Sequence, residues 1–280
     1  MTTAQRIIKY LAIALAMFLI VGIVVGILQG IAAILSLDGS SSIEDELFEL
    51  TVETDGKSVE ALCIELSASD LTVKRGDTLR VETNNTDVTC TQRDGVLSLR
   101  EKARGGRIFG ISFGNVKSGT VILTLPDAVF EEITLENGAG KVTADVLSAK
   151  RAEFDFGAGN VEIECLTVTE SIEINGGVGN FTVKDGILRD LKLDMGVSDV
   201  EIRALLLGEC DLNLDVGNAK ITILGDAKDY RVILDKGIGK AQVNGQTVKG
   251  GSAYGDGENL VDIDGGIGSI EVTFVMGTEG

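Results

Sequence analysis

The sequence predicts an all-β fold, a parallel β-solenoid (β-helix) with coils of about 20 residues, preceded by one N-terminal transmembrane helix. Two observations predict the solenoid. A glycine-centred phrase recurs at a near-constant spacing, and apolar residues alternate with polar ones on both sides of each copy. Such self-similarity is typical of stacked-repeat architectures. A third observation, an apolar run near the N-terminus, predicts the helix.

The apolar run comes first in the chain. Leu11 to Leu28 are 18 consecutive residues without a charge or an amide side chain, and the apolar character continues to Leu35. This length suffices to cross a bilayer. A cleaved signal peptide is the alternative, because Ala32 and Ala33 are small residues near the end of the run.

The charges around this run predict its orientation. Arg6 and Lys9 precede it, and only acidic residues follow closely. The positive-inside rule then places the N-terminus in the cytoplasm and the large C-terminal domain outside. We therefore expect a single-pass protein of the cell membrane with four parts: a cytoplasmic tail (1–10), a transmembrane helix (11–35), a linker and cap (36–61) and a β-strand-repeat ectodomain (62–276).

The repeated phrase contains G-x-G between two alternating apolar runs, as in FDFGAGNVEI and IEINGGVGNFTV. We call its last residue the anchor. The anchors are Gly140, Gly159, Gly179, Ser198, Gly217, Gly239 and Gly268. They are spaced by 19, 20, 19, 19, 22 and 29 residues. The glycines among them are predicted structural turn residues, since a tight corner needs positive φ or close backbone approach.

Apolar residues occupy fixed columns around the anchors. Every residue five before, two after and four after an anchor is apolar. Stacking of successive coils in register explains this alignment, whereas an antiparallel meander or sandwich does not require it. The long last spacing holds residues 245–259, which we expect to form an exposed loop. Residues 43–61 are expected to cap the first coil.

An outward polar column stands four residues before the anchors. It comprises Glu136, Asp155, Asn175, Asp194, Asn213, Asp235 and Asp264. Its acids Asp155, Asp194, Asp235 and Asp264 are the weak candidates for a cation site, because Ca²⁺ prefers oxygen ligands. The alternation of Asp with Asn favours the alternative, a solvated polar stripe. A second column, one residue after the anchors, contains several Asn residues that are expected to hydrogen-bond between coils.

The four cysteines are expected to play structural roles. Cys165 and Cys210 fall in apolar columns and are predicted to be buried thiols too far apart to bond. Whether Cys63 and Cys90 pair depends on whether their strands are neighbours, which the sequence leaves open.

Composition limits the function. The net charge of −18 disfavours nucleic-acid binding. The chain has no histidine, the commonest general base, and no tryptophan. We therefore expect no enzymatic activity, no catalytic residues and no cofactor.

The G-x-G phrase, the apolar N-terminal run and the terminal copy DIDGGIGSIEV resemble the putative-adhesin family of bacterial β-strand-repeat envelope proteins. The resemblance covers roughly residues 62–275 and implies a β-helical ectodomain of unknown function at the cell surface. The expected role is a structural or interaction module of the cell envelope, with an envelope protein or the cell wall as partner. An envelope-sensing ectodomain working with a membrane partner is the alternative. A β-helical polysaccharide-active enzyme is a more distant one.

Overall fold

The computed structural model describes residues 46–102, 106–108, 111–113 and 119–275. The predicted cytoplasmic tail and transmembrane helix, and most of the predicted linker, lie outside these residues. Within the described ranges, no helix has the length and apolar character that a membrane crossing requires.

The described chain is built from strands. In chain order they are β1 (Phe48–Glu49), β2 (Glu53–Thr54), β3 (Ala61–Leu66), β4 (Asp70–Arg75), β5 (Arg80–Thr83), β6 (Val88–Arg93), β7 (Val96–Glu101), β8 (Gly106–Ile108), β9 (Ile111–Phe113), β10 (Thr120–Leu125), β11 (Phe130–Ala139), β12 (Val142–Val183), β13 (Gly186–Arg189), β14 (Leu191–Leu207), β15 (Glu209–Leu224), β16 (Tyr230–Val243), β17 (Gln246–Thr247), β18 (Ser252–Tyr254) and β19 (Asn259–Val275). A short 3₁₀ helix, η1 (Ala227–Asp229), precedes β16. All strands except the β8–β9 pair belong to one sheet.

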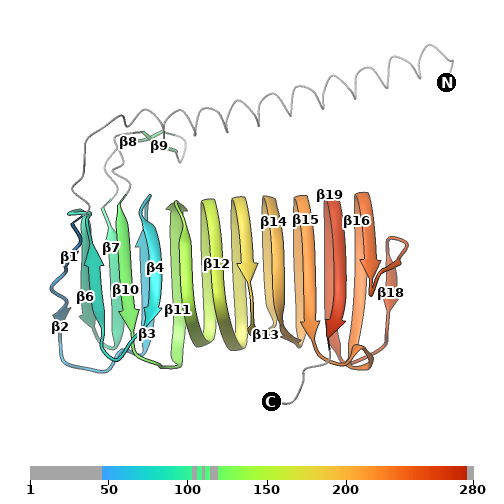
Figure 1. Ribbon diagram of the computed structural model, residues 1–280, viewed down its shortest axis with the longest axis horizontal. Helices are drawn as coiled ribbons and strands as arrows, with labels where there is room; N and C mark the ends of the chain where they lie inside the picture. The colour runs from blue at the N-terminus through green and yellow to red at the C-terminus, as the bar shows by residue number, and fades with distance from the viewer. Residues whose placement is uncertain (1–45, 103–105, 109–110, 114–118, 276–280) are drawn as a thin grey trace, which may run out of the picture. The chain divides into compact units, whose positions relative to one another are not determined.

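The central coils, residues 130–224, stack in sequence order. β11 pairs in parallel with β12, β12 with β14, and β14 with β15. Equivalent residues of successive repeats are direct partners: Ile174 lies opposite Leu193, and Leu193 opposite Leu212. Figure 1 shows these strands side by side along the stack. The sequence prediction of an all-β, solenoid-like fold is therefore confirmed.

The predicted apolar columns form the core. All residues five before, two after and four after the anchors are buried. Phe154, Ile174 and Leu193, for example, are fully inaccessible to solvent. Each such side chain contributes about 1.5–3 kcal/mol through burial. Because every coil contributes the same positions, one continuous core runs through the stack.

At six of the seven anchors, all except Ser198, the closeness of the coils favours glycine. Gly179 has φ +144°, and a Cβ atom at this position would overlap the carbonyl oxygen of Gly159 in the neighbouring coil. A Cβ atom at Gly159 would likewise overlap the carbonyl oxygen of Gly140, and one at Gly268 would overlap that of Gly217. The predicted reasons for these glycines, positive φ and close backbone approach, are both confirmed.

The coils do not follow sequence order at the C-terminal end. β19 pairs in parallel with β15 on one side and with β16 on the other. The last coil therefore occupies a slot between two earlier ones, as Figure 1 shows. The predicted exposed loop 245–259 is corrected: it contains β17 and β18, which pair antiparallel with β16 at the end of the sheet. The chain needs this long segment to turn back into the slot.

Sequence order also breaks at the N-terminal end. The first coil, β3–β4, pairs with the central coils and, on its other side, with β7 and β10. β6 and β5 then pair antiparallel with β7 and β10. β1 and β2 pair with β5 and β6. The expected cap over the first coil is thus corrected, because these two strands cover the coil of residues 80–93 instead.

All four cysteines are free thiols. Cys63 and Cys90 are not bonded: Cys63 lies opposite Ser98 of β7, and Cys90 opposite the buried Leu99. Cys63 and Cys90 therefore point to opposite faces of the sheet. Burial raises the pKa of both Cys90 and Cys210 to about 11, so these thiols are poor nucleophiles. For Cys210 the predicted burial is confirmed.

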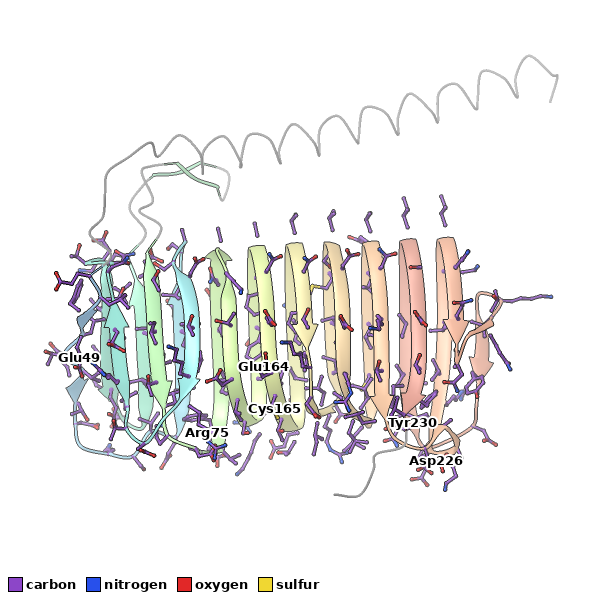
Figure 2. The ribbon with its side chains drawn as sticks, viewed as in Figure 1. Glu49, Arg75, Glu164, Cys165, Asp226 and Tyr230 are labelled. Atoms are coloured by element: carbon purple, nitrogen blue, oxygen red, sulfur yellow. The ribbon has the colours of Figure 1, made fainter. Side chains whose placement is uncertain are left out.

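The predicted burial of Cys165 is wrong, since this residue is only half-buried. Two successive residues, Glu164 and Cys165, turn away from the core at this corner, and Leu166 takes the buried position. Figure 2 shows Glu164 and Cys165 close together near one edge of the stack. In the later coils alternation runs unbroken through Ala204 and Ile223, which are buried. Counting from the anchor fails because the early coils carry one extra outward residue here.

Candidate functional site

A groove runs along the outside of the stack, across the coils, with a volume of about 800 Å³. One wall is the predicted polar column, four residues before the anchors. The opposite wall stands two residues before the anchors and consists largely of glycines. The polar wall comprises Glu65, Glu136, Asp155, Asn175, Asp194 and Asn213, and the facing wall includes Ser67, Gly138, Gly157, Gly177, Gly196 and Asp215. The groove is thus a product of the repeat itself.

The polar wall is a ladder of direct neighbours. Glu65 lies opposite Glu136, Glu136 opposite Asp155, and Asn175 opposite Asp194. The predicted outward orientation is confirmed, since none of these side chains is buried. At the N-terminal end of the ladder, the Arg100 guanidinium donates to Glu65 Oε1 at 2.8 Å.

Carboxylates and amides bond in pairs along this wall. Asn175 Nδ2 donates to Asp155 Oδ1 at 2.9 Å, and Asn213 Nδ2 donates to Asp194 Oδ1 at 2.9 Å. Each pair keeps a free amide N–H and several acceptor lone pairs. From Asp155 to Asn213 the alternation of Asp and Asn therefore produces a mixed donor and acceptor surface, whereas Glu65, Glu136 and Asp155 are adjacent carboxylates.

The floor of the groove is formed by the column three residues before the anchors. Phe156 lies between the rings of Phe154 and Phe181, with centroids at 6.0 and 6.2 Å. Met195 covers the space beside Gly176, where a Cβ atom would overlap the Met195 sulfur. The middle of the groove therefore has an apolar floor between polar and glycine walls.

Asn137 belongs to the same floor column and is only 3% exposed. Its Nδ2 donates to the carbonyl of Ser69 at 3.2 Å. Its Oδ1 has no hydrogen-bond partner among the residues that the structure describes. Buried acceptors normally find a donor. Asn137 Oδ1 is therefore a buried acceptor beneath the groove lining that no described residue satisfies.

Glu101 closes the N-terminal end of the groove. Its Oε2 accepts from the backbone N–H groups of Ser67, Ala68 and Ser69 at 2.9, 3.1 and 3.2 Å, and its Oε1 accepts from Asn85 at 2.8 Å. This corner belongs to the degenerate copy CIELSASDLTV, which lacks the G-x-G phrase. The Glu101 carboxylate, at the end of β7, therefore satisfies the three backbone N–H groups of that corner.

The four acids proposed as cation ligands do not form one cluster. Asp155 and Asp194 line the groove, whereas Asp264 and Asp235 continue the ladder beyond it, with Asn213 opposite Asp264. Across the described ranges, no group of three or more acidic or cysteine side chains is arranged to hold a metal ion. Each of the four acids therefore lies in a different coil of the ladder.

The second Asn-rich column connects coils, as predicted. Asp199 Oδ1 accepts from both the backbone N–H and the side-chain amide of Asn218, each at 2.9 Å. The backbone N–H of Asn180 donates to Asn160 Oδ1 at 3.2 Å. This column lies on the other side of the anchors and does not line the groove.

A ridge of aliphatic side chains follows the position directly before the anchors. Its members are partly exposed, from 36% to 65%: Val178, Val197, Val216, Ile267 and Ile238. Each is the direct neighbour of the next along the stack. The stack thus presents the same kind of residue at each coil on this surface too.

Sequence reasoning placed the polar wall but missed the floor and the closed end. Asn137, Phe156 and Met195 occupy a column that is not uniformly apolar, so it was not recognised as inward. The available signal was the continued alternation, since Phe156 and Met195 each follow a buried residue by two positions. Glu101 lies in a segment without the repeat and had no such signal.

Comparison with known proteins gives a family and two similar structures. A family model described as Toastrack DUF4097 matches residues 59–259. A crystal structure of a putative cell adhesion protein from Clostridium sporogenes is 17% identical over 82% of this chain and 99% of that chain, with a TM-score of 0.35. A putative adhesin from Bacteroides fragilis is 12% identical over 81% and 96%, with a TM-score of 0.34. No curated protein matches the chain.

Proposed function

The chain belongs to the Toastrack DUF4097 family, and from this premise we propose that it is a membrane-anchored interaction module of the cell envelope, exposed outside the cytoplasm. The family match agrees with the resemblance to putative adhesins expected from the repeated phrase. The family description names no reaction, and the chain has no histidine. The proposal therefore includes no catalytic step.

The continuous outer ladder carries this proposal. The interior is filled by buried apolar columns, so recognition takes place on the outside. There each coil presents the same positions to solvent in a fixed register, as the pairing of Asp194 with Asn213 illustrates. Extended surfaces of stacked repeats are suited to binding long partners. The groove along the polar wall is one of these surfaces.

The anchor in this proposal is the apolar segment of residues 11–35. Residues 1–10 form a cytoplasmic tail, residues 36–61 a linker and cap, and residues 62–276 the ectodomain. Arg6 and Lys9 before the segment, and acidic residues after it, support this orientation. The partner is an envelope protein or a cell-wall component.

A release experiment on intact cells tests the proposal. A recognition site for a specific protease is inserted between residues 38 and 45, and the protease is added outside the cells. We expect a fragment that begins at the cut to appear in the medium, with residues 1–37 retained in the membrane fraction by mass spectrometry. The chain without the inserted site is the control. Release only after cell lysis contradicts the orientation, and a mature chain lacking residues 1–37 contradicts the anchor.

A further inference from the structure

We propose that the groove binds one strand of a neutral, hydroxyl-rich polysaccharide, lying along the stack. This inference rests on the proposed function, since it names the ligand class of the same outward surface. Three properties of the groove carry it: its length, the composition of its polar wall, and its floor.

The length points to a polymer. Six successive positions of the polar wall line the groove, from Glu65 to Asn213. Neighbouring strands lie about 4.8 Å apart, so five intervals span about 24 Å. A small molecule would contact only one or two of these positions. A chain with a repeating unit meets an equivalent position at each coil.

The polar wall selects the chemistry of that polymer. Anionic polymers are repelled by Glu136, Asp155 and Asp194 and by the net charge of −18. A hydroxyl group both donates and accepts, and it matches a carboxylate–amide pair such as Asp194–Asn213, which offers both functions side by side. Asn175 and Asn213 interrupt the row of carboxylates on this wall, whereas a strongly cationic polymer would bind better to carboxylates at all six positions. Along this wall, amides already donate to Asp155 and Asp194.

The floor supports the same ligand. The half-buried Phe156, with the nearly covered Met195 beside it, provides an apolar surface at the centre of the groove, where the C–H face of a sugar ring can pack. The glycine wall carries no side chains that would obstruct a broad ring. Polar groups on one side and apolar groups below would fix the orientation of the strand.

The test measures binding by the full chain, kept in mild detergent because of its apolar N-terminal segment. The probes are soluble linear glucan, soluble mannan and an N-acetylhexosamine hexasaccharide, with poly-lysine as the cationic polymer. Calorimetric titration gives the dissociation constants. We expect at least one neutral probe to bind. Failure of all three neutral probes overturns the proposal.

Two matched variants locate the binding. Asp194→Ala removes a carboxylate of the groove, and Asp199→Ala removes one from the same coil outside it. Asp194 accepts one amide N–H of the next coil, from Asn213, and Asp199 accepts two, the backbone and side-chain N–H groups of Asn218, each at 2.9 Å. The control variant therefore loses at least as many inter-coil bonds as the groove variant. We expect about tenfold weaker binding for Asp194→Ala, because hydrogen bonds to charged groups are strong, and less than a twofold change for Asp199→Ala. Equal changes overturn the assignment to the groove.

A charge-neutral variant separates the two polymer classes. Asp155→Asn with Asp194→Asn removes two charges but keeps acceptors at both positions. We expect about threefold weaker binding of the neutral probe, with little dependence on salt. Binding of poly-lysine alone, abolished in this variant and by salt, would replace the polysaccharide with a cationic polymer. These assays use purified protein, so their failure is separate from failure of the release experiment, which reports only location.

Discussion

The central coils and the C-terminal coils are built from the same phrase but are assembled differently. In residues 130–224, each coil stacks on the coil that precedes it in the sequence. After Leu224 the chain passes over one position, forms β16, and returns as β19 into the slot between β15 and β16. The phrase therefore determines how two coils fit together but not which two coils meet.

The connections determine which coils meet. Central anchors are 19 or 20 residues apart, which leaves enough chain only for one coil. Between Gly239 and Gly268 the spacing is 29, and the additional residues form β17 and β18, antiparallel to β16. Asn259 at the start of β19 accepts from the backbone N–H of Gly208 at 3.0 Å and donates to the carbonyl of Asp229 at 3.2 Å. This residue ties the returning strand to both neighbours.

Removing one coil from each region gives the largest expected difference. Deletion of residues 259–280 empties the slot and removes the buried Val261, Ile263, Ile270 and Val272. At about 1.5–3 kcal/mol each, roughly 6–12 kcal/mol is lost, close to the whole stability of a typical domain. We expect loss of cooperative urea unfolding for this variant, followed by circular dichroism.

The comparison for this deletion is excision of residues 199–217, which also removes one coil. Ser198 then joins Asn218, and each apolar column closes over the gap because the next coil presents equivalent residues. We expect this variant to unfold cooperatively, with a midpoint below that of the intact chain. Equal loss of cooperativity in both variants would show that the slot has no special role.

A single methyl group tests the fit between central coils. Gly179→Ala places Cβ over the carbonyl oxygen of Gly159 and adds strain at φ +144°. We expect the free energy of unfolding to fall by about 3 kcal/mol or more, measured by urea titration. Gly251→Ala is the control, since Gly251 has φ +73° but no atom within 4 Å of the added Cβ. It should cost about 1 kcal/mol. If the two variants lost similar amounts of stability, positive φ alone would explain the need for glycine at the anchors.

These features explain how far the sequence could predict the fold. The alternation of apolar and polar residues around Phe154, Ile174 and Leu193 can be read from residues adjacent in the sequence, so the core was predictable. The position of β19 depends on contacts with strands far away in the sequence, and only the irregular spacing indicated it. Cys165 was misplaced because one extra residue at a corner shifts alternation without changing the anchor spacing.

The candidate site was predictable to a similar extent. Asp155 and Asp194 were recognised because they repeat at a fixed distance from the anchors. Their role as partners of Asn175 and Asn213 requires knowing that the coils are in register. Glu101 reaches the groove through the pairing of β7 with β3, a contact between strands that are not adjacent in sequence. No local pattern encodes that contact.

The smallest expected effect concerns charge at the C-terminal coils, where acids meet without separating amides. Asp262 lies opposite Asp211, and Asp264 lies opposite Asp235. Partial burial, followed by repulsion from Asp211, Asp264 and Asp235, raises the pKa of Asp262 above its ordinary value. The folded chain therefore holds this proton to higher pH than the unfolded chain. Stability from this group is present below about pH 3.9 and is lost as pH rises through the folded-state pKa.

Asp262→Asn removes this titration and tests its sign. We expect the variant to have a slightly higher free energy of unfolding than the unaltered chain at pH 7, and the difference to vanish near pH 3, where Asp262 is protonated. Urea titrations at several pH values measure it. High salt should reduce the part of the stability difference at pH 7 that comes from repulsion by the neighbouring acids, and should leave the part that comes from burial. A variant less stable at pH 7 would mean that the Asp262 carboxylate makes a favourable contact in the folded chain, and that adjacent acids are tolerated here as they are along the central ladder.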